Sequence, residues 1–142
     1  MAITPYDIAR VASMAADSKK GQDIVVLDLT AKTDVCDYFV ICSATSNPQA
    51  DAIVDEIREK VRANCGVTAI STEGREGRNW ILIDFGSVVA HVFKPETRDF
   101  YRLEKLWGDA PEVDMDLGGP AGEGGESGEA GEGDPAGQPR RL

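Results

Sequence analysis

The sequence predicts an α/β fold in which helices flank a mixed β-sheet of about five strands. Three segments carry apolar residues at helical spacing, and the runs between them are short and rich in β-branched and aromatic residues. Along the chain these segments read helix, two strands, helix, three strands, helix. Helices placed among strands in this way are expected to cover the sheet.

Residues 4 to 21 predict the first helix. Thr4 is a suitable N-cap, Pro5 suits the first helical position, and Gly21 ends the segment. One face of this helix is apolar and should lie on the core; it consists of Ile8, Val11, Ala12 and Ala15. Residues 23 to 29 and 37 to 44 follow as two strands joined by a polar loop.

Residues 47 to 66 predict the second helix, with Asn47 as the N-cap and Gly66 as the end. Its buried face consists of Ile53, Ile57 and Val61. Residues 67 to 72 predict the third strand, and a hairpin over residues 80 to 93 supplies two more. After Pro95 a last helix is expected, with an inward face made of Phe100, Leu103, Leu106 and Trp107.

Composition divides the chain into a folded domain, residues 1–111, and an acidic, glycine-rich tail, residues 112–142. From Asp109 onward nine acidic residues stand against two arginines, so this end carries −7 of the formal net charge of −10. The tail has too few apolar groups to offset the entropy of ordering it, and we expect it to be disordered. The domain itself is only mildly acidic, which argues against direct binding of nucleic acid through a basic face.

No apolar run approaches the roughly 20 residues that span a membrane. The N-terminus also lacks the basic start and apolar stretch of a signal peptide. We therefore expect a cytoplasmic protein with no membrane partner. The chain has three cysteines without CxxC spacing, and we expect reduced thiols at Cys36, Cys42 and Cys65 rather than disulfides or zinc ligands.

The hairpin has two different faces if its turn is Phe85-Gly86, because side chains alternate across a strand. One face is wholly aliphatic and should be core: Ile81, Ile83, Val88, Ala90 and Val92. The other mixes large apolar and polar groups, and this register sets its Trp80 opposite His91: Trp80, Leu82, Asp84, Ser87, Val89, His91 and Phe93. From the pattern alone, the mixed face is either covered by a helix of the same chain or left open as a docking patch.

Motifs that would indicate catalysis are incomplete. Residues 84–86 read "DFG", as in kinases, but the glycine-rich phosphate loop, the strand lysine and the "HRD" loop are missing from the sequence. His91 lies near Asp84 and Ser87 in the hairpin, but no GxSxG motif accompanies them. The loop "EGREGRN" lacks the spacing of a phosphate-binding loop. We expect no enzyme, no cofactor and no metal.

Four segments together resemble the ribosomal silencing factor family, also called Iojap-like proteins. They are "GQDIVVLDL", "DYFVICSATSN", "EGREGRNWILIDFGSVVAHVF" and "ETRDFYRLEKLWGDAP", and they span residues 21 to 111. The resemblance implies an α/β fold similar to nucleotidyltransferases. This sequence lacks the paired-aspartate metal motif of a working nucleotidyltransferase, so the fold similarity carries no activity here.

The resemblance also implies a non-enzymatic, cytoplasmic factor that binds large-subunit ribosomal protein fourteen at the face where the small subunit docks. Such a factor blocks joining of the ribosomal subunits and lowers translation under starvation. Homodimers are a further implication. Two alternatives stay open: a ribosome-maturation adaptor that binds the large subunit without preventing joining, and a small nucleotidyltransferase-like enzyme.

The family's interaction surface includes the tryptophan of the hairpin, which matches Trp80. The resemblance therefore favours the docking patch over the covered face. Strand alternation extends the predicted partner-binding residues to Leu82, Asp84, Val89 and His91. Since most ribosomal proteins are basic, Asp84 can pair with a lysine or arginine while Trp80 and Leu82 supply apolar area.

Overall fold

The computed structural model of the chain describes residues 3–102 and 110–115. Five strands form one sheet in the order β1-β2-β5-β4-β3. β2 and β5 are parallel and the other neighbours are antiparallel, so the sheet is mixed, as predicted. In chain order the elements are α1 (Pro5–Ser18), β1 (Gln22–Asp28), β2 (Tyr38–Ser43), α2 (Asn47–Cys65), β3 (Ser71–Glu73), β4 (Trp80–Asp84), β5 (Val88–Phe93) and α3 (Pro95–Tyr101).

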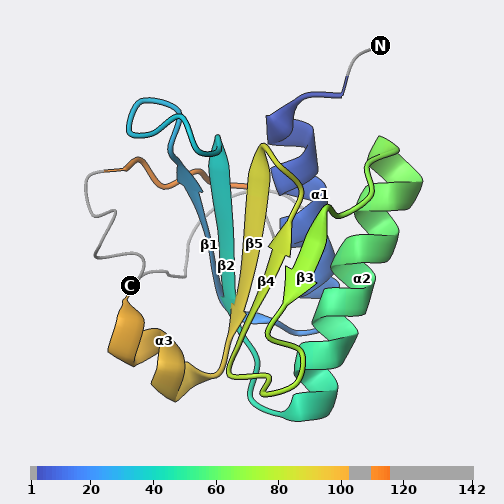
Figure 1. Cartoon of the computed structure of the whole chain (residues 1–142), viewed down its shortest axis with the longest axis vertical. Coiled ribbons are helices and arrows are strands. Elements are labelled where there is room, and N and C mark those ends of the chain that lie inside the picture. The colour runs from blue at the N-terminus through green and yellow to red at the C-terminus, as the bar shows by residue number, and fades with distance from the viewer. Residues whose placement is uncertain (1–2, 103–109, 116–142) are drawn as a thin grey trace, which may run out of the picture.

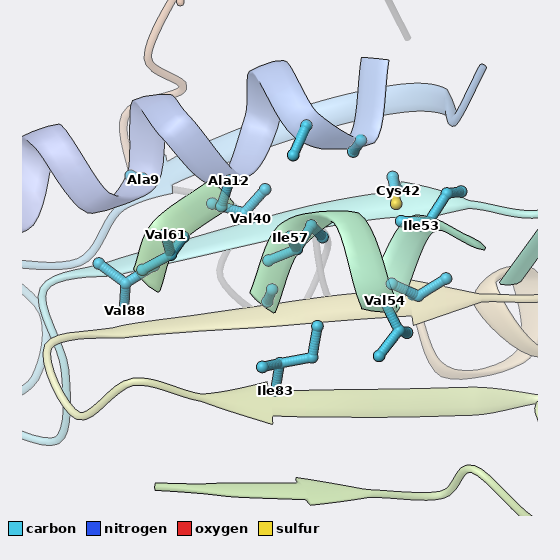
Figure 2. Close-up of a cluster of buried hydrophobic side chains, with 14 of the residues drawn as sticks. Ala9, Ala12, Val40, Cys42, Ile53, Val54, Ile57, Val61, Ile83 and Val88 are labelled. Carbon is cyan, nitrogen blue, oxygen red and sulfur yellow. The ribbon is translucent and has the colours of Figure 1, made fainter. Parts of the chain in front are cut away.

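The main core lies between the sheet and two of the helices. α1 and α2 pack against each other on one face of the sheet, whereas α3 lies apart from them, near the end of β5 (Figure 1). Side chains of α2 point toward α1 and toward the sheet (Figure 2), and the labelled ones from α2 are Ile53, Val54, Ile57 and Val61. The predicted apolar faces of the first two helices are therefore confirmed, and the second face of the sheet is left for other contacts.

Local sequence explains where the first two helices begin and where α2 ends. Thr4 and Asp7 form a capping box, in which each side chain accepts the other residue's backbone N–H, at 3.2 and 2.9 Å. The N-cap of α2 is Ser46 and not Asn47, because the Ser46 hydroxyl accepts the Gln49 N–H at 3.2 Å. The Asn47 side chain instead accepts a hydrogen bond from Lys94 Nζ at 2.6 Å. Gly66 ends α2 in the left-handed region, with φ 71°.

The hairpin has a different register from the predicted one. Trp80 pairs with Phe93, and Leu82 pairs with His91, so Trp80 is not directly opposite His91. The Phe85 N–H donates to the Val88 carbonyl at 2.9 Å, and the turn is therefore Gly86-Ser87. Gly86 has a φ of 90°, which glycine adopts without a steric penalty. The pairing shifts by two residues in total, so the predicted division into two faces is kept.

The last helix is shorter than predicted, since α3 ends at Tyr101 and Arg102 is left-handed with φ 50°. The expectation that Phe100 points inward is wrong, because its side chain is 80% exposed. Leu103, Leu106 and Trp107 lie outside the described residues.

Residues 110–115 run along the outer edge of β1. The Val113 N–H donates to the Val26 carbonyl at 2.7 Å, and Leu27 forms an isolated antiparallel bridge with Glu112. Met115 is only 3% exposed and belongs to the main core. Packing therefore extends beyond residue 111, where we expected the tail to begin, because these residues pair with β1 and Met115 supplies an apolar side chain. Residues 116–142 of the predicted tail lie outside the described residues.

Candidate functional site

The predicted partner-binding residues share the face of the sheet that α1 and α2 leave uncovered. Burial alternates along β4, where Ile81 and Ile83 are buried in the helix-covered core while Trp80, Leu82 and Asp84 are half-buried on the other side. Neighbouring β5 contributes two further residues to this side, half-buried Val89 and buried His91. We call these five residues the hairpin face: Trp80, Leu82, Asp84, Val89 and His91.

A second apolar cluster lies beneath and beside this face. Phe93 and Ile41 are fully buried in it, and Trp80, Val89 and Phe39 pack against it as partly buried side chains. This side of the sheet is therefore partly covered and partly open. The Phe93 end is covered, and four of the five hairpin-face residues keep some exposure.

Trp80 is held on this cluster by a hydrogen bond and by ring contacts. Its indole Nε1–H donates to His91 Nδ1 at 3.0 Å. The indole stacks on Phe93, with ring centroids 4.9 Å apart. Phe39 meets the His91 ring edge-on, with centroids 4.5 Å apart. The tryptophan therefore sits on a rigid aromatic base and offers its remaining surface outward.

His91 lies below this surface, with 3% of the residue exposed. Burial lowers the pKa of its imidazole to about 4, so the ring is neutral at pH 7. One ring nitrogen is occupied by Trp80, and the other, Nε2, is buried without a hydrogen-bond partner among the described residues. In this arrangement neither nitrogen can reach a substrate to move a proton. Of the five predicted residues, His91 is the one that cannot touch a partner directly.

The other end of the hairpin face is acidic. Asp84 Oδ1 accepts the Gly86 N–H at 2.7 Å, which orients its carboxylate across the turn. Burial, then Asp37 and then Asp84, raise the pKa of the Cys36 thiol to about 11. These two carboxylates therefore produce a negative potential where the loops meet the strands, which favours a positively charged neighbour.

The helix α3 adds residues that sequence analysis did not place in the site. Tyr101 packs against the Trp80 indole with ring centroids 4.9 Å apart, and Phe100 packs edge-on against Tyr101 at 5.0 Å. Arg98 is buried, and its Nη1 donates to the Ser43 hydroxyl at 2.9 Å, which ties α3 to the end of β2. The exposed fractions of Phe100 and Tyr101 are 80% and 51%, so the aromatic surface continues from Trp80 onto α3. The adjacent aromatic residues Phe100 and Tyr101 are visible in the sequence, but only the structure of α3 shows that both are exposed.

Among the described residues, no group of three or more histidine, cysteine, aspartate or glutamate side chains could hold a metal ion. In the same part of the chain, no helix is long and apolar enough to cross a membrane. Cys36, Cys42 and Cys65 are all buried and free, as expected.

Comparison with known proteins decides the family. A family profile described as "Ribosomal silencing factor during starvation" matches residues 2–137. The chain belongs to the ribosomal silencing factor family. The matched range extends beyond residues 21–111, which the four family-like segments span, at both ends.

Relatives of this family align over most of the domain. Ribosomal silencing factor RsfS of Bacillus subtilis (strain 168) is 43% identical over 111 residues, which are 78% of this chain and 93% of the relative. A mouse protein named "Mitochondrial assembly of ribosomal large subunit protein 1" is 35% identical over 104 residues, or 72% of this chain and 45% of that protein. A crystal structure of a Chromobacterium violaceum protein superposes with a TM-score of 0.72 at 32% identity, covering 82% of this chain and 95% of the other. The predicted family and fold class are thus confirmed.

Proposed function

We propose that this silencing factor binds large-subunit ribosomal protein fourteen through its hairpin face and blocks joining of the ribosomal subunits, which represses translation under starvation. Membership of the family and the name of the Bacillus subtilis relative support a role in ribosome silencing. The protein acts in the cytoplasm, as a binding factor and not as an enzyme. One observation carries the choice of surface: Trp80 is partly exposed, yet it is fixed by His91 and Phe93.

A fixed and partly exposed tryptophan is well suited to be an interface anchor. Its large ring buries apolar area on docking, and little conformational entropy is lost because its orientation is already set. Leu82 and Val89 add half-buried aliphatic surface beside it. Such a centre, once covered by a partner, excludes water and supplies most of the binding energy.

Charge defines the kind of partner that this face accepts. Asp84 and Asp37 make the loop end of the face negative, as their effect on Cys36 indicates. Ribosomal proteins are mostly basic, so a lysine or arginine of the partner can pair with Asp84 while its apolar side chains cover Trp80. Blocking of subunit joining is then steric, because the bound domain occupies the surface that the small subunit requires.

The proposal can be tested with separated large and small subunits run on a sucrose gradient with the protein. We expect the wild type to travel with the large subunit and to reduce the yield of joined ribosomes. Trp80→Glu should do neither. Met14→Glu is a matched control, since Met14 is 48% exposed on α1, in the helix layer on the opposite side of the sheet. The proposal fails if wild type stays at the top of the gradient, or if both variants behave alike.

A ribosome-maturation adaptor is the second candidate, and the name of the mouse relative is the observation that favours it. An adaptor would travel with the large subunit on the same gradient but would leave the yield of joined ribosomes unchanged. The two candidates are therefore separated by the joining readout and not by binding.

We also propose that the chain forms homodimers, and the case in which the dimer uses the same hairpin face can be tested. Binding to the ribosomal protein then requires the dimer to dissociate. Sedimentation of the purified protein alone should show dimers that Trp80→Glu weakens. A complex that holds two copies on one ribosomal protein would contradict this competition.

A further inference from the structure

The contact between Trp80 and His91 has a direction that ring stacking lacks. Stacked rings can slide over one another at little cost, whereas an N–H donor must point at its acceptor. The Trp80 indole is stacked on Phe93 and packs at a tilt against Tyr101, both at centroid distances of 4.9 Å. Within residues 3–102 and 110–115, the hydrogen bond to His91 Nδ1, at 3.0 Å, is the one contact that specifies which way the indole N–H points.

We infer that His91 is a positioning residue: as a neutral imidazole protonated at Nε2, it holds the Trp80 indole in the orientation that a docking partner meets. This inference rests on the proposed function, because Trp80 is taken as the anchor. It replaces the expectation of direct contact between His91 and the partner, since only 3% of this residue is exposed.

The tautomer follows from the hydrogen bond. A neutral imidazole has one N–H donor and one acceptor nitrogen. Because Nδ1 accepts from the indole, the proton lies on Nε2, which is buried and has no partner among the described residues. A buried donor without an acceptor destabilises a protein, and a phenylalanine ring would fill this space without that cost. Packing alone thus leaves the histidine unexplained, whereas the need for an acceptor explains it.

The surroundings keep His91 in this neutral form. Phe39 from β2, Trp80 from β4 and Phe93 from β5 all lie within 6.1 Å of its ring, measured between centroids. Among the described residues, the charged groups on this face are separated from the His91 ring by apolar neighbours. Asp84 pairs with Val89 further along the hairpin, and Glu73 lies beyond Leu82 on β3. Arg98 is bound to Ser43, which lies beyond Phe93. None of these charges contributes to the pKa shift of His91, which burial alone causes.

The first experiment uses the free protein and needs no partner. Long-range ¹H–¹⁵N NMR spectra of the single histidine, at pH 7, should show protonated Nε2 and unprotonated Nδ1. The indole proton of Trp80, assigned by comparison with Trp107→Phe, should be shifted by its nitrogen acceptor and protected from exchange with water. A histidine protonated at Nδ1, or an unprotected Trp80 indole proton, would overturn the inference whether or not the protein binds ribosomes.

The second experiment measures binding to large subunits. His91→Phe keeps an aromatic ring but removes the acceptor, and it should weaken binding about fivefold, the effect of one hydrogen bond. His91→Gln keeps a side-chain acceptor and should restore most of the affinity. If both variants bind like wild type while Trp80→Glu does not, positioning by His91 is wrong and the proposed function stands. If wild type itself does not bind, the proposed function fails, and the NMR result alone decides whether His91 holds the indole.

Discussion

Burial of a neutral histidine makes the stability of this protein depend on pH in a way that can be worked out in advance. His91 has an ordinary pKa of 6.5 when exposed and about 4 in the folded protein. Between pH 6.5 and pH 4 the imidazole of His91 binds a proton in the unfolded chain but stays mostly unprotonated in the folded protein. The free energy of unfolding therefore falls as the pH falls below 6.5. This part of the stability is complete above pH 6.5 and is lost progressively down to pH 4.

The size of the effect follows from the shift. Each pKa unit corresponds to about 1.4 kcal/mol, so the full loss is roughly 3 kcal/mol and about 2 kcal/mol of it has occurred by pH 5. For a domain of this size that is a large fraction of a typical total stability. This loss comes from His91 alone, because the chain contains one histidine.

The assay is urea unfolding of wild type and His91→Phe, followed by circular dichroism at pH 7.5, 6.5, 5.5 and 5.0, conditions chosen from the shift. Carboxylates titrate in both proteins, so their contribution cancels when the two curves are subtracted. We expect wild type to lose about 2 kcal/mol more than the variant between pH 7.5 and 5.0. Parallel curves would refute the reasoning, because they would mean that His91 is as easily protonated in the folded protein as in the unfolded chain.

Three further predictions concern the framework around the site. Gly74→Ala should destabilise the protein by at least about 2 kcal/mol in the same urea assay, because Gly74 has a φ of +88° and a Cβ there would lie 2.1 Å from the Trp80 carbonyl oxygen. Gly77→Ala is the control and should be nearly neutral, since the space around Gly77 is open. Ser46→Ala should cost about 1 kcal/mol through loss of the α2 N-cap, and an unchanged urea midpoint would argue against that cap. Burial raises the thiol pKa to about 12 at Cys42, and burial together with two carboxylates raises it to about 11 at Cys36. Both thiols should therefore react with Ellman's reagent at pH 8 only as fast as the chain unfolds. Immediate reaction of these two cysteines would contradict their burial.

The sequence by itself determined the features that depend on neighbouring residues. The Thr4 and Asp7 capping box, the left-handed Gly66 and the apolar faces of α1 and α2 all arise within a few positions along the chain. Strand alternation likewise sorted the hairpin into a core face and a mixed face, because a side-chain period of two needs no knowledge of the partner strand. Four short segments within residues 21–111 were enough to indicate the family.

Only the tertiary structure decided which residues of the mixed face are open and which are covered. Alternation is the same for two registers that differ by two residues, so it could not tell whether Trp80 pairs with His91 or with Phe93. The state of His91 depends on Phe39, which is distant in sequence and adjacent only because β2 and β5 pair in parallel. Tyr101 meets Trp80 for a similar reason, since α3 is held against the sheet by contacts between distant residues, such as that of Arg98 with Ser43. Burial and hydrogen bonding are properties of neighbours in space, and these neighbours are brought together by the sheet.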